Sequence, residues 1–481
     1  MSPSQSRNGE AFTNFGWLVC VWILLIPFQY GYHISVLNQI QAVVTCKDVN
    51  GPDSQHYSYG LPTCLPMSDF KFSVVTAVFT VGGLAGSLVA NLIMDRWGRR
   101  GAARLSSLLV AIGAGLMTVS ASVTILGLGR LLVGVGSGIG LCVGPIYLSE
   151  IAPSKISGNV GVLTQLGIVL GIMITQAIGL RFATPTQWRS VLFLSAAGSV
   201  AQFFLSGLVV ESPAWLGGKG QVEPRKAVAR KLWGTVPPAT RRFPLPSSPA
   251  TQMSVFTAAD ASVEDPLLEE LEAHRDENVT ALTVPQVLAA RELRKPLAIV
   301  CFAMLSQQLS GINAVLYYSN DILSKSLPEF GPYVSLGITI VNVLMTFPPI
   351  LLIERMGRRQ LLTLSTLGAI SSLVLVGLGL NTSIVTLSSV AILTFVTSFA
   401  IGLGPVPFVM IPEVSPYHAV SALSSIALSL NWTANFIVGL VFLPLRNLLS
   451  DGEATKEGRV FYLFAVALFA SMFSLSRVYR G

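Results

Sequence analysis

NLIMDRWGRR at residues 91–100 and ILLIERMGRR at residues 350–359 are two versions of one charged turn. In each, an acidic residue is followed by Arg-x-Gly-Arg-Arg at the end of a long apolar run. A helix needs ~20 apolar residues to cross the ~30 Å hydrocarbon core of a bilayer, and such runs recur along almost the whole chain. The repetition of this rare turn, once in each half, predicts a duplicated membrane protein.

The composition agrees with a membrane location. Of 481 residues, 52% are hydrophobic and 11% are charged, and the mean hydropathy is +0.64. Soluble domains carry about 25% charged residues. The N-terminal stretch MSPSQSRNGEAFTNFG has no small-residue cleavage site ahead of the first apolar run, so we expect that run to remain as an anchor.

We expect an all-α membrane protein with twelve transmembrane helices in two six-helix bundles. The spans are predicted near residues 15–38, 71–94, 101–122, 124–149, 159–181, 188–210, 296–320, 331–353, 360–380, 385–412, 419–443 and 457–477. The bundles then cover residues 15–210 and 295–477, joined by a polar linker at 211–294. An N-terminus at 1–14 and a tail at 478–481 complete the chain.

Lys and Arg in the short loops predict the orientation, because cytoplasmic loops carry the excess of positive charge. These residues fall on one side together with the N-terminus and the linker, which we assign to the cytoplasm: Arg96, Arg99, Arg100, Lys155, Arg355, Arg358, Arg359, Arg477 and Arg480. The net charge of +7 is then a topology signal and not a sign of nucleic-acid binding. Helical spacing from Pro266 and from Thr283 predicts short helices within the linker, with a solvated linker as the alternative.

The five cysteines include one candidate disulfide. Cys46 and Cys64 both fall in the outer loop, where an oxidising compartment would allow a disulfide, and two free thiols are the alternative. The other three lie in spans as small apolar side chains: Cys20, Cys142 and Cys301. No Cys/His spacing matches a metal-ligand set and no nucleophile-base pair is present, so we expect no metal, no cofactor and no enzymatic activity.

Neutral amides dominate the polar positions within the spans. Away from span ends the candidate cations are His33 and Arg130, and no Asp or Glu occurs there. The amides are Gln165, Gln176, Gln307, Gln308, Asn313, Asn342, Asn431 and Asn435. An amide offers both a donor and an acceptor without charge, which suits a neutral polyhydroxyl ligand, while bonding between helices is the alternative role. Gly311 and the stretch GLGPVP (402–407) interrupt two spans beside these amides, as helix breaks do at transporter substrate sites.

Longer stretches of the chain resemble the sugar porter branch of the major facilitator superfamily. They are QQLSGINAVLYYS (307–319), PIYLSEIAPSKISGNVGVLTQLGIVLGI (145–172), ESPAWL (211–216), GLGPVP (402–407) and NWTANFIVG (431–439). The two charged turns fit the paired cytoplasmic motifs of that family, and the match covers nearly all of the chain in order. The resemblance implies a major facilitator fold whose two bundles alternate access to a central site for a hexose-like monosaccharide.

By position, the resemblance carries over a set of sugar contacts, gates and a latch. The sugar contacts fall on Gln165, Gln307, Gln308, Asn313 and Asn342, with Asn435 as a further candidate, Trp432 below the sugar ring, and Phe408. The gating positions fall on Tyr317, Tyr318, Gly404 and Pro405. The cytoplasmic salt-bridge latch falls on Asp95, Arg96, Arg99, Arg100, Glu150, Glu211, Glu354, Arg355, Arg358, Arg359 and Glu413.

The chain departs from the family at the sugar site. Ala400 stands where glucose facilitators place a Glu, and Phe408 stands where they place a Trp. One acidic acceptor and one indole N–H are therefore missing. A pentose, a polyol or another sugar remains an alternative to glucose.

The latch also departs from the family, in both halves. Ser157 and Val420 stand where the family places an Arg, although Lys155 and His418 are near enough to substitute. A lysine supplies a point charge and not the bidentate fork of an arginine. We therefore expect a weaker lock on the outward-facing state and a balance moved towards the inward-facing state.

His33 determines how we expect transport to be driven. Proton symporters of this family resemble one another in an Asp directly after a Gly-Tyr pair, whereas here Gly31 and Tyr32 precede a histidine. Because no span contains a buried carboxylate, downhill facilitation is favoured. Histidine titrates near ~6.5 and could carry a proton, with Arg130 lowering its pKa if close, so symport through His33 is the alternative.

A non-transporting sugar sensor is the alternative of another class, although the tail offers little length for recruiting partners. We expect a monomer that binds a small neutral sugar or polyol within the lipid bilayer. No lipidation or retention signal selects between the plasma membrane and a vacuolar membrane.

Overall fold

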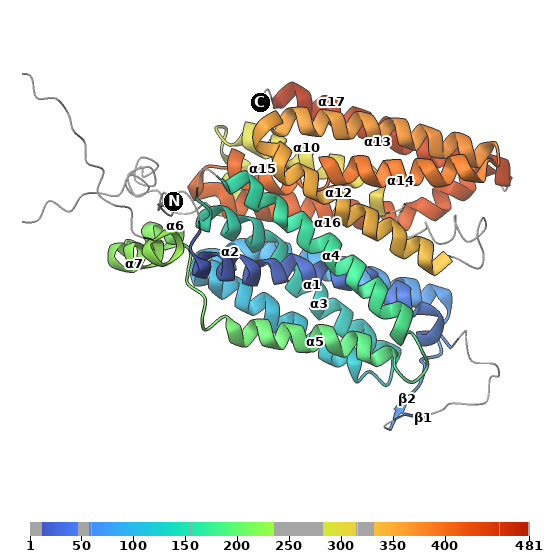
Figure 1. Ribbon diagram of the computed structural model, residues 1–481, viewed down its shortest axis with the longest axis horizontal. Coiled ribbons are helices and arrows are strands. Elements are labelled where there is room, and N and C mark those ends of the chain that lie inside the picture. Colours follow the sequence, from blue (N-terminus) through green and yellow to red (C-terminus); the bar gives the residue numbers. More distant parts are fainter. Residues whose placement is uncertain are drawn as a thin grey trace, which may run out of the picture.

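The computed structural model describes residues 12–46, 57–58, 60–153, 156–234, 282–313, 315, 331–451 and 453–479. Its long helices run side by side in two groups, with the N-terminal half in blue and green and the C-terminal half in yellow to red (Figure 1). Within the described residues, ten helices are long and apolar enough to cross a membrane. The described part of the chain is therefore that of a helical membrane protein, with one short hairpin of two-residue strands.

The N-terminal half is built from five long helices. They are α1 (Asn14–Val44), α2 (Asp69–Thr118), α3 (Val123–Ile151), α4 (Ser157–Phe182) and α5 (Trp188–Leu205). The 50 residues of α2 form two helices that meet at Gly98, where φ is 77° and ψ is −178°. This backbone conformation is essentially restricted to glycine. The first charged turn is thus the joint between two helices.

The C-terminal half repeats this arrangement with more interruptions. Its helices are α10 (Arg294–Leu309), α12 (Gly331–Met356), α13 (Arg358–Asn381), α14 (Val385–Ile401), α15 (Val406–Val414), α16 (Val420–Ser450) and α17 (Arg459–Val478). The 3-10 helices η2 (Tyr417–Ala419) and η3 (Ala454–Lys456) precede the last two. Gly357 joins α12 to α13 with φ of 78° and ψ of 161°. The second charged turn therefore repeats the backbone conformation of the first.

Short elements lie at the two ends of the bundle. The short helices are α6 (Pro213–Gly218), α7 (Val222–Trp233) and α9 (Val284–Ala289), and β1 (Tyr57–Ser58) pairs antiparallel with β2 (Leu61–Pro62). α9 confirms the helix predicted from Thr283, whose capping box with Gln286 starts it. The stretch from Pro266 lies outside the described residues. α7 was not predicted, although its buried Ala229, Leu232 and Trp233 follow a helical period.

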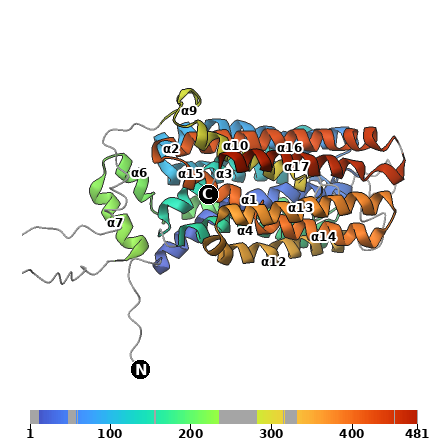
Figure 2. The same cartoon turned by 90° about the horizontal axis from the view of Figure 1, so that it is seen from above.

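α6 and α7 lie at one end of the bundle (Figures 1 and 2), and the hairpin lies at the other (Figure 1). We name the first the charged end, because both charged turns lie there, and the sequence predicts it to be cytoplasmic. The backbone N–H of Thr13 donates to Leu232 O at 2.9 Å, and Trp233 Nε1 donates to Ile151 O at 2.8 Å. These bonds fasten α7 to the N-terminal half.

At the opposite end, Cys46 and Cys64 form a disulfide with a Cα–Cα distance of 5.3 Å. The backbone N–H of Leu65 donates to Val44 O at 2.8 Å, and Trp188 Nε1 donates to Thr63 O at 2.6 Å. The first outer loop is thereby tied to the last turn of α1 and to the start of α5.

Helices α2 and α3 touch at backbone level. A Cβ atom added to Gly86 would lie 2.2 Å from the carbonyl oxygen of Val135, and one added to Gly138 would lie 2.1 Å from that of Gly83. Small residues permit such close approach, which supplies much of the packing energy between helices in lipid. Each glycine here is required by the opposing backbone.

The two halves meet at the charged end. Ser424 Oγ donates to Cys142 O at 3.2 Å, and Tyr417 Oη donates to Ala214 O at 2.8 Å. A Cβ atom at Gly158 in α4 would lie 1.9 Å from Glu354 Oε1 in α12. The structure is therefore a state closed at the charged end. The predicted shift towards the inward-facing state concerns a balance between states and stays a prediction.

Candidate functional site

A cavity lies between the halves, about midway along the helices. The described residues that line it come from α1, α4, α10, α12, α14, α15, α16 and the segment after Gly311: Tyr30, Ile34, Gln165, Ile168, Val169, Ile172, Gln307, Gln308, Ile312, Asn313, Asn342, Phe399, Phe408 and Asn431. Its volume is about 50 Å³, against roughly 300–1,000 Å³ for most small-ligand sites. A ring-sized ligand therefore requires the surrounding elements to move apart.

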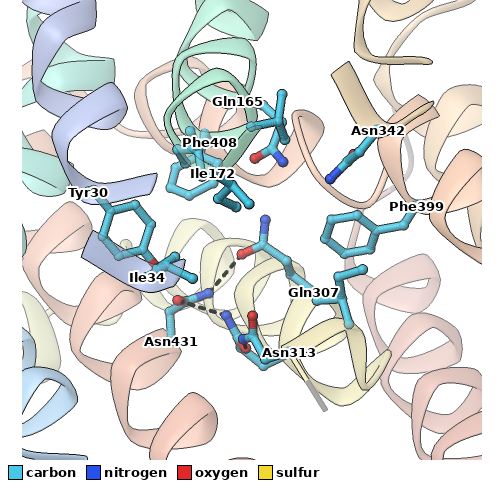
Figure 3. A pocket seen from close by; sticks show the side chains of 14 residues that line it. Tyr30, Ile34, Gln165, Ile172, Gln307, Asn313, Asn342, Phe399, Phe408 and Asn431 are labelled. Atoms are coloured by element: carbon cyan, nitrogen blue, oxygen red, sulfur yellow. Dashed lines mark hydrogen bonds between the residues drawn. The ribbon is translucent and has the colours of Figure 1, made fainter. Parts of the chain in front are cut away.

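The C-terminal half supplies a chain of hydrogen-bonded amides. Asn313 Nδ2 donates to Gln308 Oε1 at 2.5 Å, and Gln308 Nε2 donates to Asn431 Oδ1 at 3.0 Å. Asn431 Nδ2 donates to Gln307 Oε1 at 2.9 Å (Figure 3). Gln307 Nε2 ends the chain on the carbonyl oxygens of Leu403 and Gly404, at 3.3 and 2.9 Å.

Two further amides face the cavity without joining this chain. Asn342 is buried, and its Oδ1 has no hydrogen-bond partner. Gln165 comes from α4 in the other half and lies against Gly404, whose added Cβ would be 3.1 Å from Gln165 Nε2. Both side chains point into the cavity (Figure 3). A buried amide without a partner costs free energy, which a ligand hydroxyl can recover.

The remaining wall is apolar and aromatic. Tyr30, Phe399 and Phe408 surround the cavity together with Ile34 and Ile172 (Figure 3). An aromatic or branched surface packs against the C–H face of a sugar ring, while the amides bond to its hydroxyls. Among the described residues that line the cavity, none carries a charge.

The structure brings most of the predicted sugar contacts together, with two differences. Gln165, Gln307, Gln308, Asn313, Asn342 and Phe408 all line the cavity. Trp432 does not line it in this state, because its indole packs against Gly83 and lies edge-on to Tyr30 and Phe79, each at 5.5 Å. Asn435 is buried on α16 and is not among the lining residues.

Sequence reasoning missed Asn431 and Tyr30 as cavity residues. Asn431 stands directly before Trp432, and it was recognised as a membrane amide but not assigned to the site. Adjacent residues on a helix face different directions, so the motif alone could not show which one faces the cavity. Tyr30 lacked any signal beyond its place in an apolar run.

The gating positions are partly described. Gly404 and Pro405 lie in the break between α14 and α15, where the Gly404 N–H reaches back to Phe399 O at 2.9 Å. Tyr317 and Tyr318 lie outside the described residues. The break therefore sits beside the cavity, and the outer gate stays a prediction.

Comparison with known proteins identifies the family. The family described as "Sugar (and other) transporter" matches residues 19–478. A probable metabolite transport protein of Saccharomyces cerevisiae is 32% identical over 92% of this chain and 88% of its own length. The facilitated glucose transporter member 3 of Canis lupus familiaris is 33% identical over 86% of this chain and 81% of its own length. This chain belongs to the sugar transporter family.

The fold agrees with that assignment. The proton:xylose symporter XylE, bound to 6-bromo-6-deoxy-D-glucose, has a TM-score of 0.76 at 18% identity, covering 95% of this chain and 94% of its own. An inward open conformation of XylE from E. coli has a TM-score of 0.64 at 18% identity, covering 96% and 95%. The protein is thus a sugar transporter of the major facilitator superfamily, an integral multi-pass membrane protein and not an enzyme.

In this sugar transporter His33 and Arg130 lie in one buried cluster outside the cavity lining. Arg130 Nη1 donates to the backbone oxygen of His33 at 2.8 Å, and its guanidinium lies 4.5 Å from the ring centre of Phe79. Ser195 Oγ donates to Gln29 Oε1 at 2.7 Å and lies 2.6 Å from His33 Nε2. Because the one hydroxyl hydrogen points at Gln29, His33 donates to Ser195 through Nε2–H.

The N-terminal part of the predicted latch is a buried network. Arg99 Nε donates to both oxygens of Glu150, at 3.1 and 2.9 Å, and Nη2 donates to Oε1 at 2.7 Å. Glu211 accepts the backbone N–H groups of Arg99 and Arg100, at 2.9 and 3.1 Å, and so caps the second helix of α2. Burial raises the pKa of Glu211, while the backbone donors work in the opposite direction.

The C-terminal part of the latch is more exposed. Arg358 Nη2 donates to Glu413 Oε1 at 2.6 Å and to Glu354 Oε1 at 3.2 Å. The other latch residues lie outside these two ion-pair networks. Arg100 Nε donates to Ser206 O at 2.8 Å, Asp95 is half-buried, and Arg96, Arg355 and Arg359 are exposed. Of the two proposed substitutes, Lys155 lies outside the described residues, and the backbone oxygen of His418 accepts from Leu282.

Proposed function

We propose that this sugar transporter carries a neutral monosaccharide by alternating access, downhill and without coupling to protons. The observation that carries the proposal is the cavity lining, in which six amides face aromatic and branched side chains and no lining residue is charged. Amides recognise hydroxyl groups without requiring a charge on the ligand. Membership of the sugar transporter family supports a sugar as the ligand. We propose that the carrier acts as a monomer.

We also propose that the chain crosses the membrane twelve times. The break at Gly98 divides α2 into two crossings, and α10 with the segment after Gly311 would form the seventh, giving twelve spans in two six-helix bundles. The bundles would cover residues 15–210 and 295–477, with the linker 211–294, the N-terminus and the tail in the cytoplasm. The excess of Lys and Arg at the charged end supports this orientation.

The surroundings of His33 support facilitation over symport. Arg130 donates to the backbone oxygen of His33 at 2.8 Å, and a cation this close disfavours adding a second positive charge to the His33 ring. Proton symport through His33 is the second candidate, because a histidine beside an arginine in the membrane interior marks a site where protonation would alter local bonding.

Transport by purified protein in liposomes tests the proposal. Labelled hexoses, pentoses and polyols are offered with and without an inward proton gradient, using Gln308→Ala as the control variant. We expect at least one monosaccharide to equilibrate at a rate that a protonophore leaves unchanged. Accumulation that collapses with a protonophore and is absent in His33→Asn would replace facilitation with symport. Sugar binding without any uptake would replace transport with a sensor function.

A further inference from the structure

The hydrogen bonds of the amide chain all run in one donor-to-acceptor direction, and the backbone carbonyl groups at its end determine that direction. The carbonyl oxygens of Leu403 and Gly404 can only accept, so Gln307 must turn its NH2 group towards them. Gln307 Oε1 then faces Asn431, which must present its own NH2 group. The same reasoning runs through Gln308 to Asn313. All four amide orientations thus follow from the backbone carbonyls at one end of the chain.

The helix break creates those free carbonyls. In an uninterrupted helix, Leu403 O would accept from the N–H of the residue four positions later. That residue is Pro407, which has no N–H. The Gln307 amide supplies the missing donor to Leu403 and also bonds to Gly404. The break between α14 and α15 is therefore held partly by a side chain of the cavity.

Asn431 occupies the middle of this chain with its polar atoms engaged. Its Nδ2 donates to Gln307 Oε1 at 2.9 Å and lies 3.4 Å from Met304 Sδ, and its Oδ1 accepts from Gln308 at 3.0 Å. Its side chain is buried, so these bonds form away from competing water. Among the described side chains, Asn431 thus links the amide of Gln307 by hydrogen bonds to the pair formed by Gln308 and Asn313.

We propose that Asn431 is a positioning residue for sugar transport, which orients Gln307 and Gln308 and thereby ties occupancy of the cavity to the helix break at residues 402–405. The inference rests on the proposed function, since it assumes that the cavity holds the sugar. A ligand hydroxyl that bonds to Gln308 or Asn313 competes with the hydrogen bonds of these amides. The change passes through Asn431 to Gln307, which bonds to the carbonyl groups at the helix break. The conformation of residues 402–405 can then change when a sugar binds, although these residues do not contact the sugar.

Exchanging one nitrogen for oxygen tests the direction of the chain. Asn431→Asp keeps the shape but offers Gln307 Oε1 an acceptor in place of a donor. If the Gln307 amide flips, its Oε1 faces the carbonyl oxygens of Leu403 and Gly404. Two acceptor oxygens therefore face each other whether Gln307 flips or not. Protonation of the new acid restores a donor. A buried acid takes up a proton more readily than one in water, so this titration falls within an accessible pH range.

Sugar binding is measured on folded, monodisperse protein between about pH 5.5 and 8.5, with the acid variants compared with the wild type at each pH. We expect Asn431→Asp to weaken binding about tenfold or more at the alkaline end, the equivalent of losing ~1.4 kcal/mol, and to recover most of it at the acid end. Asn431→Leu, which cannot be rescued by protons, should bind weakly at every pH. Asn91→Asp places an acid at another buried amide, in α2 outside the cavity lining, and should show no such pH-dependent recovery.

Hydrogen exchange at residues 402–409 provides a readout that needs no sugar. Both Asn431 variants should exchange faster there than the wild type, and Asn431→Asp should slow again at the acid end after correction for the intrinsic pH dependence. Unchanged exchange and unchanged sugar affinity in Asn431→Asp at alkaline pH would overturn the positioning role. If the wild type binds no sugar, the proposed function fails, and the exchange result alone decides whether Asn431 holds the break.

Discussion

The two charged turns share a sequence and a backbone conformation but differ in their surroundings. Arg99 and Glu150 have side chains that are 3% and 9% exposed, whereas Arg358 and Glu413 are 21% and 30% exposed. Gly98 and Gly357 have almost the same φ, at 77° and 78°. The motif therefore determines the backbone path in both halves. The stabilisation that the Arg–Glu pair supplies in each turn depends on how deeply neighbouring elements bury it.

The cover of the first turn comes from the segment that begins α6. Glu211 accepts from the backbone of the turn, and Ser212 Oγ donates to Glu150 Oε2 at 2.5 Å. At the second turn, Gly357 is the N-cap of α13, and no side chain caps that helix. A duplicated motif has thus become a buried structural joint in one half and a partly solvated one in the other.

Removing the arginine from each turn should give the largest difference. Arg99→Met leaves Glu150, whose side chain is 9% exposed, without its ion partner, and breaking a pair this well covered costs about 3–5 kcal/mol. Arg358→Met breaks a partly exposed pair, for which about 0–1 kcal/mol is usual. Denaturant unfolding in mild detergent measures both free energies. Equal losses in the two variants would show that burial does not distinguish the turns.

Alanine at the two turn glycines should give a smaller and more selective effect. Both substitutions force a conformation that costs roughly 1–3 kcal/mol for other residues. At Gly98 the added Cβ would also lie 2.5 Å from Glu211 Oε2, while at Gly357 it meets no atom within 4 Å. Gly98→Ala should therefore lower the unfolding free energy more than Gly357→Ala. The reverse order would mean that Glu211 yields easily and contributes little to the cap.

As with the two turns, local sequence predicts the type of element, but contacts with distant residues decide its details. The apolar runs located most helices, yet the first was predicted to end at residue 38 and continues to Val44. The residues after 38 were assigned to the outer loop, but Ile40 and Val43 are buried on one face of the helix. Local composition identifies the run, whereas the point where it ends depends on what packs against it.

The site shows the same limit. Most of the cavity amides were identified as polar positions within the spans, and the family resemblance then assigned them to the sugar site, but neither shows which face of a helix lines the cavity. Trp432 was assigned below the sugar and instead packs on Gly83 across the two halves in this state. Glu211 was assigned to a salt-bridge latch, and its bonds go to backbone N–H groups. Such assignments require the positions of elements distant in sequence.

The smallest effect is expected at Tyr417, which connects the cover of the first turn to the other half. Its hydroxyl donates to Ala214 O in α6, and it lies three residues before Val420, where the family has an arginine. Tyr417→Phe removes one neutral hydrogen bond, which is worth about 0.5–1.5 kcal/mol. The balance should move up to roughly tenfold away from the state closed at the charged end.

Modification of Cys142 by a membrane-permeant maleimide reports that balance. Cys142 is buried where α3 meets α16, so the thiol reacts only when the halves separate there. The measurement uses a protein in which Cys20 and Cys301 are replaced by alanine. Tyr417→Phe should react several-fold faster than the tyrosine protein, and an unchanged rate would remove Tyr417 from the closure of this end.

The glycine contacts between α2 and α3 have a mechanical consequence. With Gly86 and Gly138 in close contact with opposing carbonyl groups, α2 and α3 cannot slide past each other without collision, so we expect this pair of helices to move as one unit. The C-terminal half has breaks in its helices at Gly311, where φ is 76°, and at residues 402–405. We therefore expect changes of shape between states to concentrate at these breaks, while α2 and α3 keep their relative positions.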